Sequence, residues 1–287
     1  MSGVISSVVT NSAAMVAVSS LNLINSQLST VQNAVSTGYS VSSAMDNGAA
    51  YAVAQSVRTD ISGLTAANQQ LGDTQGLLST TSTSLNNVSN MMQTMKATLV
   101  NLSNQAVTGS QRQQYIQQYQ SNLQNIQASI QDANYNGRTL VGNIAGSNGT
   151  FSTTAISVVS NGSGGSFSIA STGMSTIYHA LSFTSTQLSS ATSVAAFLTA
   201  TGTFSAQVTN VGTAMNTYGN LSNLVNNQIT FNQNKMTALT NGLGALVDAN
   251  MAQESAKLQS LQIQQQLATS SLSIADQSPS LLVKLFP

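Results

Sequence analysis

The chain has 287 residues, of which 41% are apolar and only 5% are charged, against the roughly 25% charged residues usual in globular proteins. Seven basic and seven acidic residues cancel, so no basic surface exists to attract nucleic acid or anionic lipid. Cysteine is absent, which excludes disulfides and thiolate metal sites, and no apolar run of about 18 residues is present to span a membrane as a helix. Because low net charge also removes the repulsion between copies, the composition indicates a protein that assembles.

Residues 14–35 show an unbroken heptad pattern, with apolar residues at alternating steps of three and four. The members of this pattern are Ala14, Ala17, Leu21, Ile24, Leu28, Val31 and Val35. No charged residue precedes Asp46, so no ion pair supports this helix, and a lone helix of this length is marginally stable in water. Burying its five largest apolar side chains would supply at most on the order of 10 kcal/mol. The helix therefore needs a partner, from the same chain or from other copies.

A second heptad register begins after a connector, rich in Ser, Gly and Asn, that extends to about Gly48. The register runs from Val57 to Ala106 and includes Leu64, Leu71, Leu78, Leu85, Val88, Met92, Met95, Leu99 and Leu102. One register of about fifty residues predicts a long helical rod, which we expect to end at Gly109. A third helix is expected from Gln111 to about Asn134, with Ile116, Leu123, Ile126 and Ile130 on one stripe.

The middle of the chain, from Thr139 to Asn234, contains no Asp, Glu, Lys or Arg. Gly-rich turns and β-branched runs at residues 156–159 and 167–170 predict a small β-rich insert, with a short helix near residues 194–198. His179 is the only histidine of the chain and has no carboxylate within this segment, so neither a metal site nor a Ser-His-Asp triad is expected. We expect no enzymatic activity and no cofactor.

Heptad spacing returns between Val208 and Leu246, where the register includes Val225, Ile229, Leu239 and Leu243. A last helix is expected from about Asp248 to Ile274, with apolar residues at Leu258, Leu261, Leu267 and Leu272 and an adjoining stripe of Ile263, Leu267 and Ile274. Pro279 is expected to stop the helix before an apolar tail that contains Leu282 and Leu285. The expected fold is mainly α with a small β insert. Long coiled-coil-like helices from both termini pack together, and a β-hairpin or β-rich outer region occupies the middle.

Short motifs at both ends of the chain resemble those of bacterial flagellins. On the N-terminal side they are Ser-Thr-Gly at 36–38, Ser-Ala-Met-Asp-Asn-Gly-Ala at 43–49, Asp-Ile-Ser-Gly-Leu at 60–64 and Tyr-Asn-Gly-Arg-Thr-Leu at 135–140. On the C-terminal side they are Glu-Ser-Ala-Lys-Leu-Gln-Ser-Leu at 254–261, Gln-Gln-Leu at 265–267 and Ser-Leu-Ser-Ile-Ala at 271–275. The order and spacing of so many matches make the resemblance specific, and the C-terminal motifs are most similar to those of alphaproteobacterial flagellins.

The resemblance implies a structural subunit that self-assembles into the hollow extracellular filament of the flagellum, used for swimming. It implies an inner coiled-coil domain from residues 1–45 and 247–287, a long-helix domain from 46–140 and 206–246, and a short variable outer region at 141–205. The apolar residues named above in the first and last helices, with the tail, would form the inner assembly seam. The apolar residues named above in the three registers between the first and last helices would pack the long-helix domain.

The family also implies partners and a route of export. Besides other copies of the chain, the partners would be the flagellar export apparatus, an export chaperone, and the filament cap and junction proteins, with neither nucleic acid nor membrane insertion. Export of flagellins needs no cleaved signal, which agrees with Arg58 as the first basic residue. The residues alone also permit a cytoplasmic protein.

Departures from the family pattern affect one further expectation. The segment that toll-like receptor 5 reads in flagellins aligns with residues 93–99, where only Lys96 keeps a basic residue and the Glu-Leu pair is replaced. We therefore expect weak or no activation of this receptor. Two alternatives stay open at this level: a hook–filament junction protein, which shares the flagellin ends, and a surface adhesin that acts through the middle insert.

Overall fold

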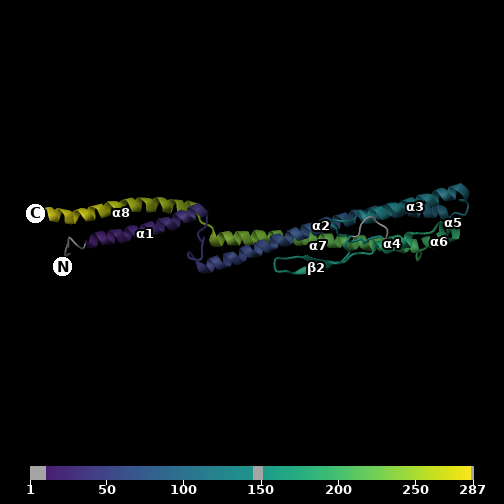
Figure 1. Ribbon diagram of the computed structural model, residues 1–287, viewed down its shortest axis with the longest axis horizontal. Helices are drawn as coiled ribbons and strands as arrows, with labels where there is room; N and C mark the ends of the chain where they lie inside the picture. Colours follow the sequence, from purple (N-terminus) through teal and green to yellow (C-terminus); the bar gives the residue numbers. More distant parts are fainter. Residues whose placement is uncertain (1–10, 145–150, 286–287) are drawn as a thin grey trace. The chain divides into compact units, whose positions relative to one another are not determined.

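The computed structural model describes residues 11–144 and 151–285, with side chains described as far as residue 277 (Figure 1). The helices are α1 (Ser12–Thr37), α2 (Gly48–Ser103), α3 (Gly109–Gln131), α4 (Met174–Leu181), α5 (Ser185–Ser189), α6 (Ala191–Leu198), α7 (Thr203–Val247) and α8 (Met251–Leu285), and the strands are β1 (Ile156–Val159) and β2 (Ser166–Ile169). The expected fold class is confirmed. The chain forms two compact units, residues 1–59 with 237–287 and residues 60–236, whose boundaries fall inside α2 and α7.

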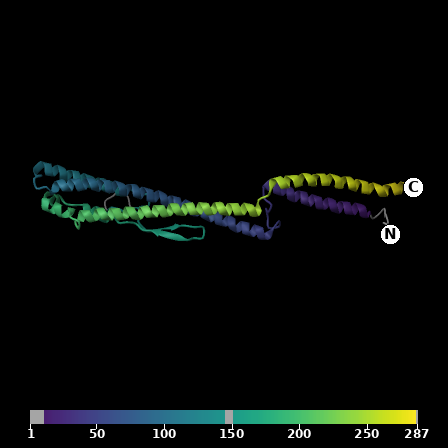
Figure 2. The same cartoon turned by 180° about the vertical axis from the view of Figure 1, so that it is seen from behind.

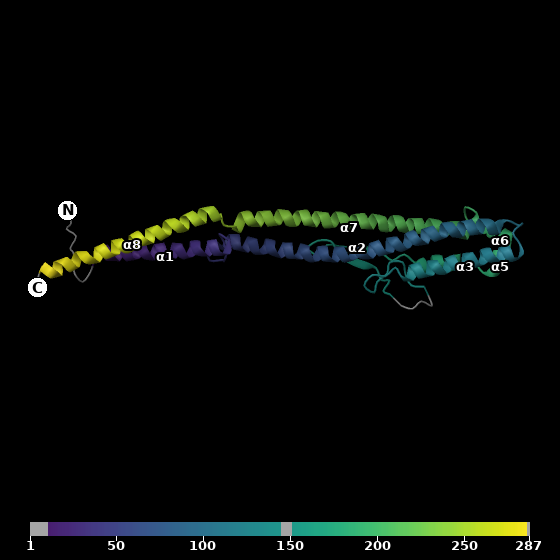
Figure 3. The same ribbon diagram turned by 90° about the horizontal axis from the view of Figure 1, so that it is seen from above.

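The first unit is built on α1 and α8, which run antiparallel side by side (Figures 1 and 3). The Asn11 side chain caps α1 by accepting from the Ala14 N–H at 3.2 Å, and its Nδ2 donates to the Ala275 carbonyl at 2.8 Å. Farther along the pair, Gln265 Nε2 donates to Asn25 Oδ1 at 2.7 Å. Gly38, with φ 77°, ends α1 in the left-handed conformation that favours glycine.

The connector between α1 and α2, residues 38–47, is held to the end of α7. The Ser40 N–H donates to the Val247 carbonyl at 2.8 Å, and Tyr39 forms an isolated antiparallel bridge with Asp248. Farther along the connector, Asp46 Oδ2 accepts hydrogen bonds from the backbone and hydroxyl groups of Ser42 and Ser43. These bonds, led by the Ser42 hydroxyl, hold the pKa of Asp46 below its usual range. The carboxylate therefore stays ionised and the loop stays closed at neutral pH.

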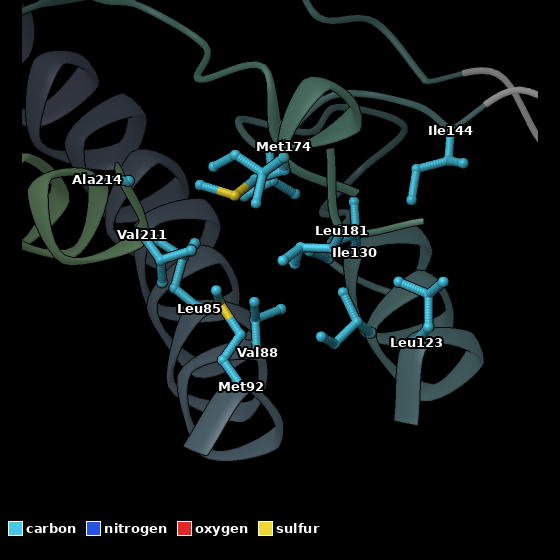
Figure 4. Packing of buried hydrophobic residues seen from close by; sticks show 14 of the residues in the cluster. Leu85, Val88, Met92, Leu123, Ile130, Ile144, Met174, Leu181, Val211 and Ala214 are labelled. Carbon is cyan, nitrogen blue, oxygen red and sulfur yellow. The ribbon is translucent and has the colours of Figure 1, made fainter. Parts of the chain in front are cut away.

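The second unit packs most of α2 against α3, α4 and α7. In α2 the predicted register faces the core at every apolar position from Leu64 to Leu102. Figure 4 shows Leu85, Val88 and Met92 of α2 beside Ile130 of α3. The helix ends at Ser103, before the predicted Gly109, because the Asn104 side chain accepts from the Ala106 N–H at 2.9 Å and starts a turn.

The two strands of the described residues form a single hairpin, besides isolated β-bridges such as that between Tyr39 and Asp248. Strands β1 and β2 pair antiparallel with Val158 opposite Phe167, and Val158 and Ile169 are buried, as the β-branched runs predicted. The rest of this segment forms three short helices, of which only α6 was expected from the sequence. Helices α5 and α6 lie at the end of the second unit where α2 turns into α3 (Figures 1 and 2).

The tip of the hairpin approaches α2 at a contact between two glycines. A Cβ atom added to Gly63 would lie 3.1 Å from the Gly162 carbonyl oxygen, and one added to Gly162 would lie 3.1 Å from the Leu64 nitrogen. The neighbouring Ser160 carbonyl accepts from Asn232 Nδ2 of α7 at 2.9 Å. The hairpin tip is thus anchored on two long helices, and its close approach to α2 leaves little room for a Cβ atom at either glycine.

We expect Gly63→Leu to lower the free energy of unfolding of the monomer by about 1–3 kcal/mol, because the new side chain displaces the hairpin tip. Gly72→Leu is the matched control, since a Cβ at Gly72 of the same helix meets nothing within 4 Å. That change is expected to stabilise the helix by up to about 1 kcal/mol. Urea unfolding followed by circular dichroism measures both, and equal effects of the two substitutions would contradict the docking.

Candidate assembly surface

Helices α1 and α8 each have one side that faces the other helix and one side that is exposed to solvent. Every apolar residue predicted from the heptad pattern of α1 lies toward α8, half-buried or buried, and Ala34 joins them. After the half-buried Glu254, the residues of α8 that are shielded on the facing side follow steps of three and four and are Leu258, Leu261, Gln265, Ala268, Leu272 and Ala275. Leu261 is only 4% exposed. We call this covered set the α1–α8 seam.

Three of the predicted residues of α8 lie elsewhere. Ile263, Leu267 and Ile274 are exposed and take no part in the α1–α8 seam, where Gln265, Ala268 and Ala275 stand instead. Two apolar stripes run along α8, and only one of them faces α1. The side chains of Leu282 and Leu285 lie outside the described residues. The helix itself continues past Pro279, because a proline in a helix interior removes one backbone hydrogen bond and can kink a helix without ending it.

The exposed stripe of α8 has a counterpart on α1. Large apolar side chains stand in solvent on both helices, on the sides turned away from the α1–α8 seam, and we call this exposed set the outer face: Met15, Val16, Val18, Leu23, Ile263, Leu267 and Ile274. No charged residue occurs in α1 or between residues 258 and 275. Exposed apolar side chains without charges among them are typical of a surface that binds another protein.

Most of the residues predicted to pack the long helices are buried. Buried residues are Leu64, Leu71, Leu78, Leu85, Val88, Met92, Met95, Leu99, Leu102, Ile116, Leu123, Ile126, Ile130 and Val225. Ile229 is half-buried against the same core. Leu239 and Leu243 are half-buried and belong to the first unit.

A buried arginine in the second unit was not predicted. Arg112 is 8% exposed, and its guanidinium donates to three carbonyl oxygens: Nε to Val107 at 2.8 Å, Nη1 to Leu188 at 3.1 Å and Nη2 to Asn104 at 3.0 Å. The side chain therefore joins the α2–α3 loop to α5. Arg112 stands four residues before Ile116, on the apolar stripe of α3. A charged residue on an apolar stripe is the feature of the sequence that could have indicated its burial.

Two buried tyrosines join the middle segment to the long helices. Tyr119 of α3 donates to the Leu181 carbonyl at 2.8 Å. The Tyr218 hydroxyl of α7 donates to the Leu140 carbonyl at 2.7 Å and accepts from the Thr172 N–H at 2.9 Å. Burial raises the pKa of both phenols above the usual value, with hydrogen bonds from Thr172 opposing the rise of the Tyr218 pKa.

These raised pKa values predict a loss of stability in alkali. Above about pH 10 the tyrosines of the unfolded chain lose protons while Tyr119 and Tyr218 keep theirs, so the unfolded state binds fewer protons and the free energy of unfolding falls by up to about 1.4 kcal/mol per pH unit for each residue. The double change Tyr119→Phe with Tyr218→Phe is expected to flatten this dependence, at a cost in stability at neutral pH. Urea unfolding between pH 8 and about pH 11.5 measures it, with Tyr51→Phe as the control. An unchanged slope in the double variant would refute the assignment.

A hollow of about 330 Å³ between α2 and β1 is open to solvent, and Asp73, Tyr135 and Arg138 are among its lining residues. Within the described ranges, no three His, Cys, Asp or Glu side chains are grouped so that they could hold a metal ion. Among the same residues, no helix is long and apolar enough to cross a membrane.

Comparison with known proteins gives a consistent result. Residues 8–146 match the bacterial flagellin N-terminal helical region, and residues 199–286 match the bacterial flagellin C-terminal helical region. Flagellin FljK of Caulobacter vibrioides is 30% identical over 282 residues, which cover 98% of this chain and 99% of that protein. A flagellin of Brucella melitensis is 30% identical over 293 residues, with the same coverage. A crystal structure of Bacillus cereus flagellin covers 57% of this chain and 88% of its own, with a TM-score of 0.47 and 14% identity.

The fold, with its terminal helix pair and its core of long helices, is that of a mainly α-helical protein. The chain belongs to the bacterial flagellin family, as its two family regions and its near full-length relatives show. Members of this family are structural proteins of the extracellular flagellar filament and are not enzymes. The resemblance predicted from the terminal motifs is confirmed.

Proposed function

We propose that this chain is the subunit that self-assembles into the hollow flagellar filament used for swimming. The outer face of the α1–α8 pair carries the proposal. Because α8 of the same molecule covers the seam side of α1, the outer face is the part left for neighbouring subunits. The seam would then hold each subunit's helix pair together, and the seven outer-face residues would hold subunits to one another.

The energetics of the outer face suit this division. Each large apolar side chain contributes about 1.5–3 kcal/mol when it passes from full exposure to full burial, so seven partly exposed ones can supply on the order of 10 kcal/mol. Association itself costs several kcal/mol, which leaves a modest surplus for each subunit. The absence of charge in α1 also favours assembly. An unpaired charge enclosed by neighbouring subunits would cost more free energy than any one of these apolar side chains contributes.

The test replaces outer-face residues without touching the seam. Leu267→Asn with Ile274→Asn is expected to raise the concentration needed for polymerisation by about a hundredfold, since two apolar contacts of about 1.5 kcal/mol each are lost. Gln266→Asn with Ser273→Asn, at exposed neighbouring positions, is the matched control. Sedimentation and electron microscopy measure assembly, and circular dichroism of the monomer shows whether the helix pair is intact. Normal filaments from the Leu267 and Ile274 variant would overturn the proposal.

The proposal includes the proteins that export and assemble such a subunit. The flagellar export apparatus and an export chaperone would handle the unfolded chain, and cap and junction proteins would contact the growing filament. The chain would then be abundant in filaments sheared from cells, whereas a junction protein would be present in few copies. Quantitative mass spectrometry of sheared material distinguishes the two.

We also expect weak or no signalling through toll-like receptor 5. In residues 93–99 of α2, the side chains of Met95, Thr98 and Leu99 are buried, and Lys96 is the one basic residue exposed to solvent. A receptor surface that requires several basic and acidic contacts would meet only one charged side chain in this segment, and we expect it to bind weakly. Reporter cells treated with purified monomer measure the response, and strong signalling at nanomolar protein would contradict the expectation.

A further inference from the structure

The methionines of this chain differ in exposure between the two units. In the first unit Met15, Met45 and Met251 are 64%, 96% and 43% exposed. In the second unit the side chains are covered: Met92, Met95 and Met174 are buried, and Met91, Met215 and Met236 are half-buried. The described methionines that a small solute can reach freely therefore all lie in the unit that carries the outer face.

We propose that Met15, Met45 and Met251 are oxidation sites for peroxides, and that oxidation of Met15 blocks assembly. The thioether sulfur attacks one oxygen of hydrogen peroxide, the O–O bond breaks, and the products are methionine sulfoxide and water. The sulfur gives up two electrons and the peroxide oxygen accepts them, so no further reactant is needed. The part of the proposal that concerns assembly rests on the proposed function of the outer face.

Met15 is the site where the reaction has a structural consequence. It belongs to the outer face with Val16 and Val18, which stand exposed within the same turn of α1. A sulfoxide places a strongly polar S–O group among these side chains, and α1 supplies no charged side chain to pair with it. When a neighbouring subunit covers this surface, the sulfoxide oxygen loses its water without gaining a donor from the apolar side chains around it.

Met45 is the natural internal comparison. It lies in the loop that the Asp46 carboxylate holds closed through Ser42 and Ser43, which keeps the Met45 side chain in solvent. It is not part of the outer face or of the α1–α8 seam. Oxidation of Met45 is therefore expected to be fast and to leave assembly unchanged.

The first experiment maps the sites on the full-length monomer. Monomer is treated with dilute hydrogen peroxide for increasing times, and peptide mass spectrometry follows the gain of one oxygen at each methionine. Met15, Met45 and Met251 are expected to react at least about tenfold faster than Met92, Met95 and Met174, because exposure governs access to the sulfur. Comparable rates in the two groups would overturn the assignment of the sites, whether or not the chain assembles.

The second experiment measures the consequence for assembly. Peroxide treatment is expected to raise the concentration needed for polymerisation about tenfold in the wild type and in Met45→Leu, and to have little effect in Met15→Leu, which keeps the volume and cannot form a sulfoxide. Treatment with methionine sulfoxide reductases is expected to restore assembly of the oxidised wild type. If Met15→Leu itself impairs assembly, Met15→Ile supplies a second unoxidisable side chain.

The outcomes separate this inference from the proposed function. Failure of the untreated chain to form filaments would contradict the proposed function and the assembly effect together, while the oxidation map would still be decided on the monomer. Normal assembly of the oxidised wild type, or equal inhibition of the Met15→Leu variant, would overturn the role of Met15 alone. Met15 in preformed filaments is also expected to react more slowly than in free subunits, and equal rates would contradict its burial there.

Discussion

Leu261→Asp is expected to abolish filament formation while leaving the second unit folded. Leu261 is 4% exposed in the α1–α8 seam, and the facing helix contains no Lys or Arg that could pair with a carboxylate. An unpaired carboxylate in such a place costs several kcal/mol, which is a large part of the at most on the order of 10 kcal/mol that the seam can supply. The helix pair should therefore separate, and α1 and α8, each marginally stable alone, should lose the helical structure that presents the outer face. Sedimentation measures the loss of assembly.

The control for this prediction lies one residue away. Ser260→Asp adds the same charge to the same helix at an exposed position and is expected to leave the α1–α8 pair intact. Deletion of residues 1–40 should reproduce the Leu261→Asp result, since it removes the partner of α8 while α2 begins only at Gly48. Filaments formed by Leu261→Asp or by the deleted chain would show that the seam is dispensable.

Arg112→Met is expected to destabilise the second unit by about 2–5 kcal/mol. The change removes the guanidinium donors from the carbonyls of Val107, Leu188 and Asn104, of which Asn104 keeps a hydrogen bond from the Val107 N–H. Each buried acceptor left unpaired costs about 1–3 kcal/mol unless water replaces the donor. Arg112→Lys should recover little of this, because one ammonium group cannot reproduce the planar fork of donors. Urea unfolding of the monomer, followed by circular dichroism, gives the difference.

Arg138→Met is the matched control for the buried arginine. It removes the same type of side chain from an exposed position in the turn after α3, and its effect is expected to stay within about 0.5 kcal/mol. Equal stability of the Arg112 and Arg138 variants would mean that the three carbonyls find other partners without cost. An intermediate result for Arg112→Lys would show how much of the effect depends on charge rather than geometry.

The sequence by itself determined the helical faces and the hairpin. Steps of three and four placed residues from Leu64 to Leu102 on one side of α2, and burying that side is the only way such a helix becomes stable. The β-branched run at Ile156–Val159 likewise indicated a strand, which pairs in register with β2. The terminal motifs were sufficient to indicate the flagellin family. These features depend on local periodicity and short motifs, which one chain displays without reference to its partners.

Only the tertiary structure decided which faces meet. Helix α8 has two apolar stripes, and periodicity alone does not say that Leu261 faces α1 while Leu267 and Ile274 face solvent. The position of Arg112 on an apolar stripe became intelligible only when the carbonyls of Asn104, Val107 and Leu188 converged on it. Periodicity shows that residues share a face, whereas the partner of that face depends on the geometry and hydrogen bonding of segments distant in the sequence.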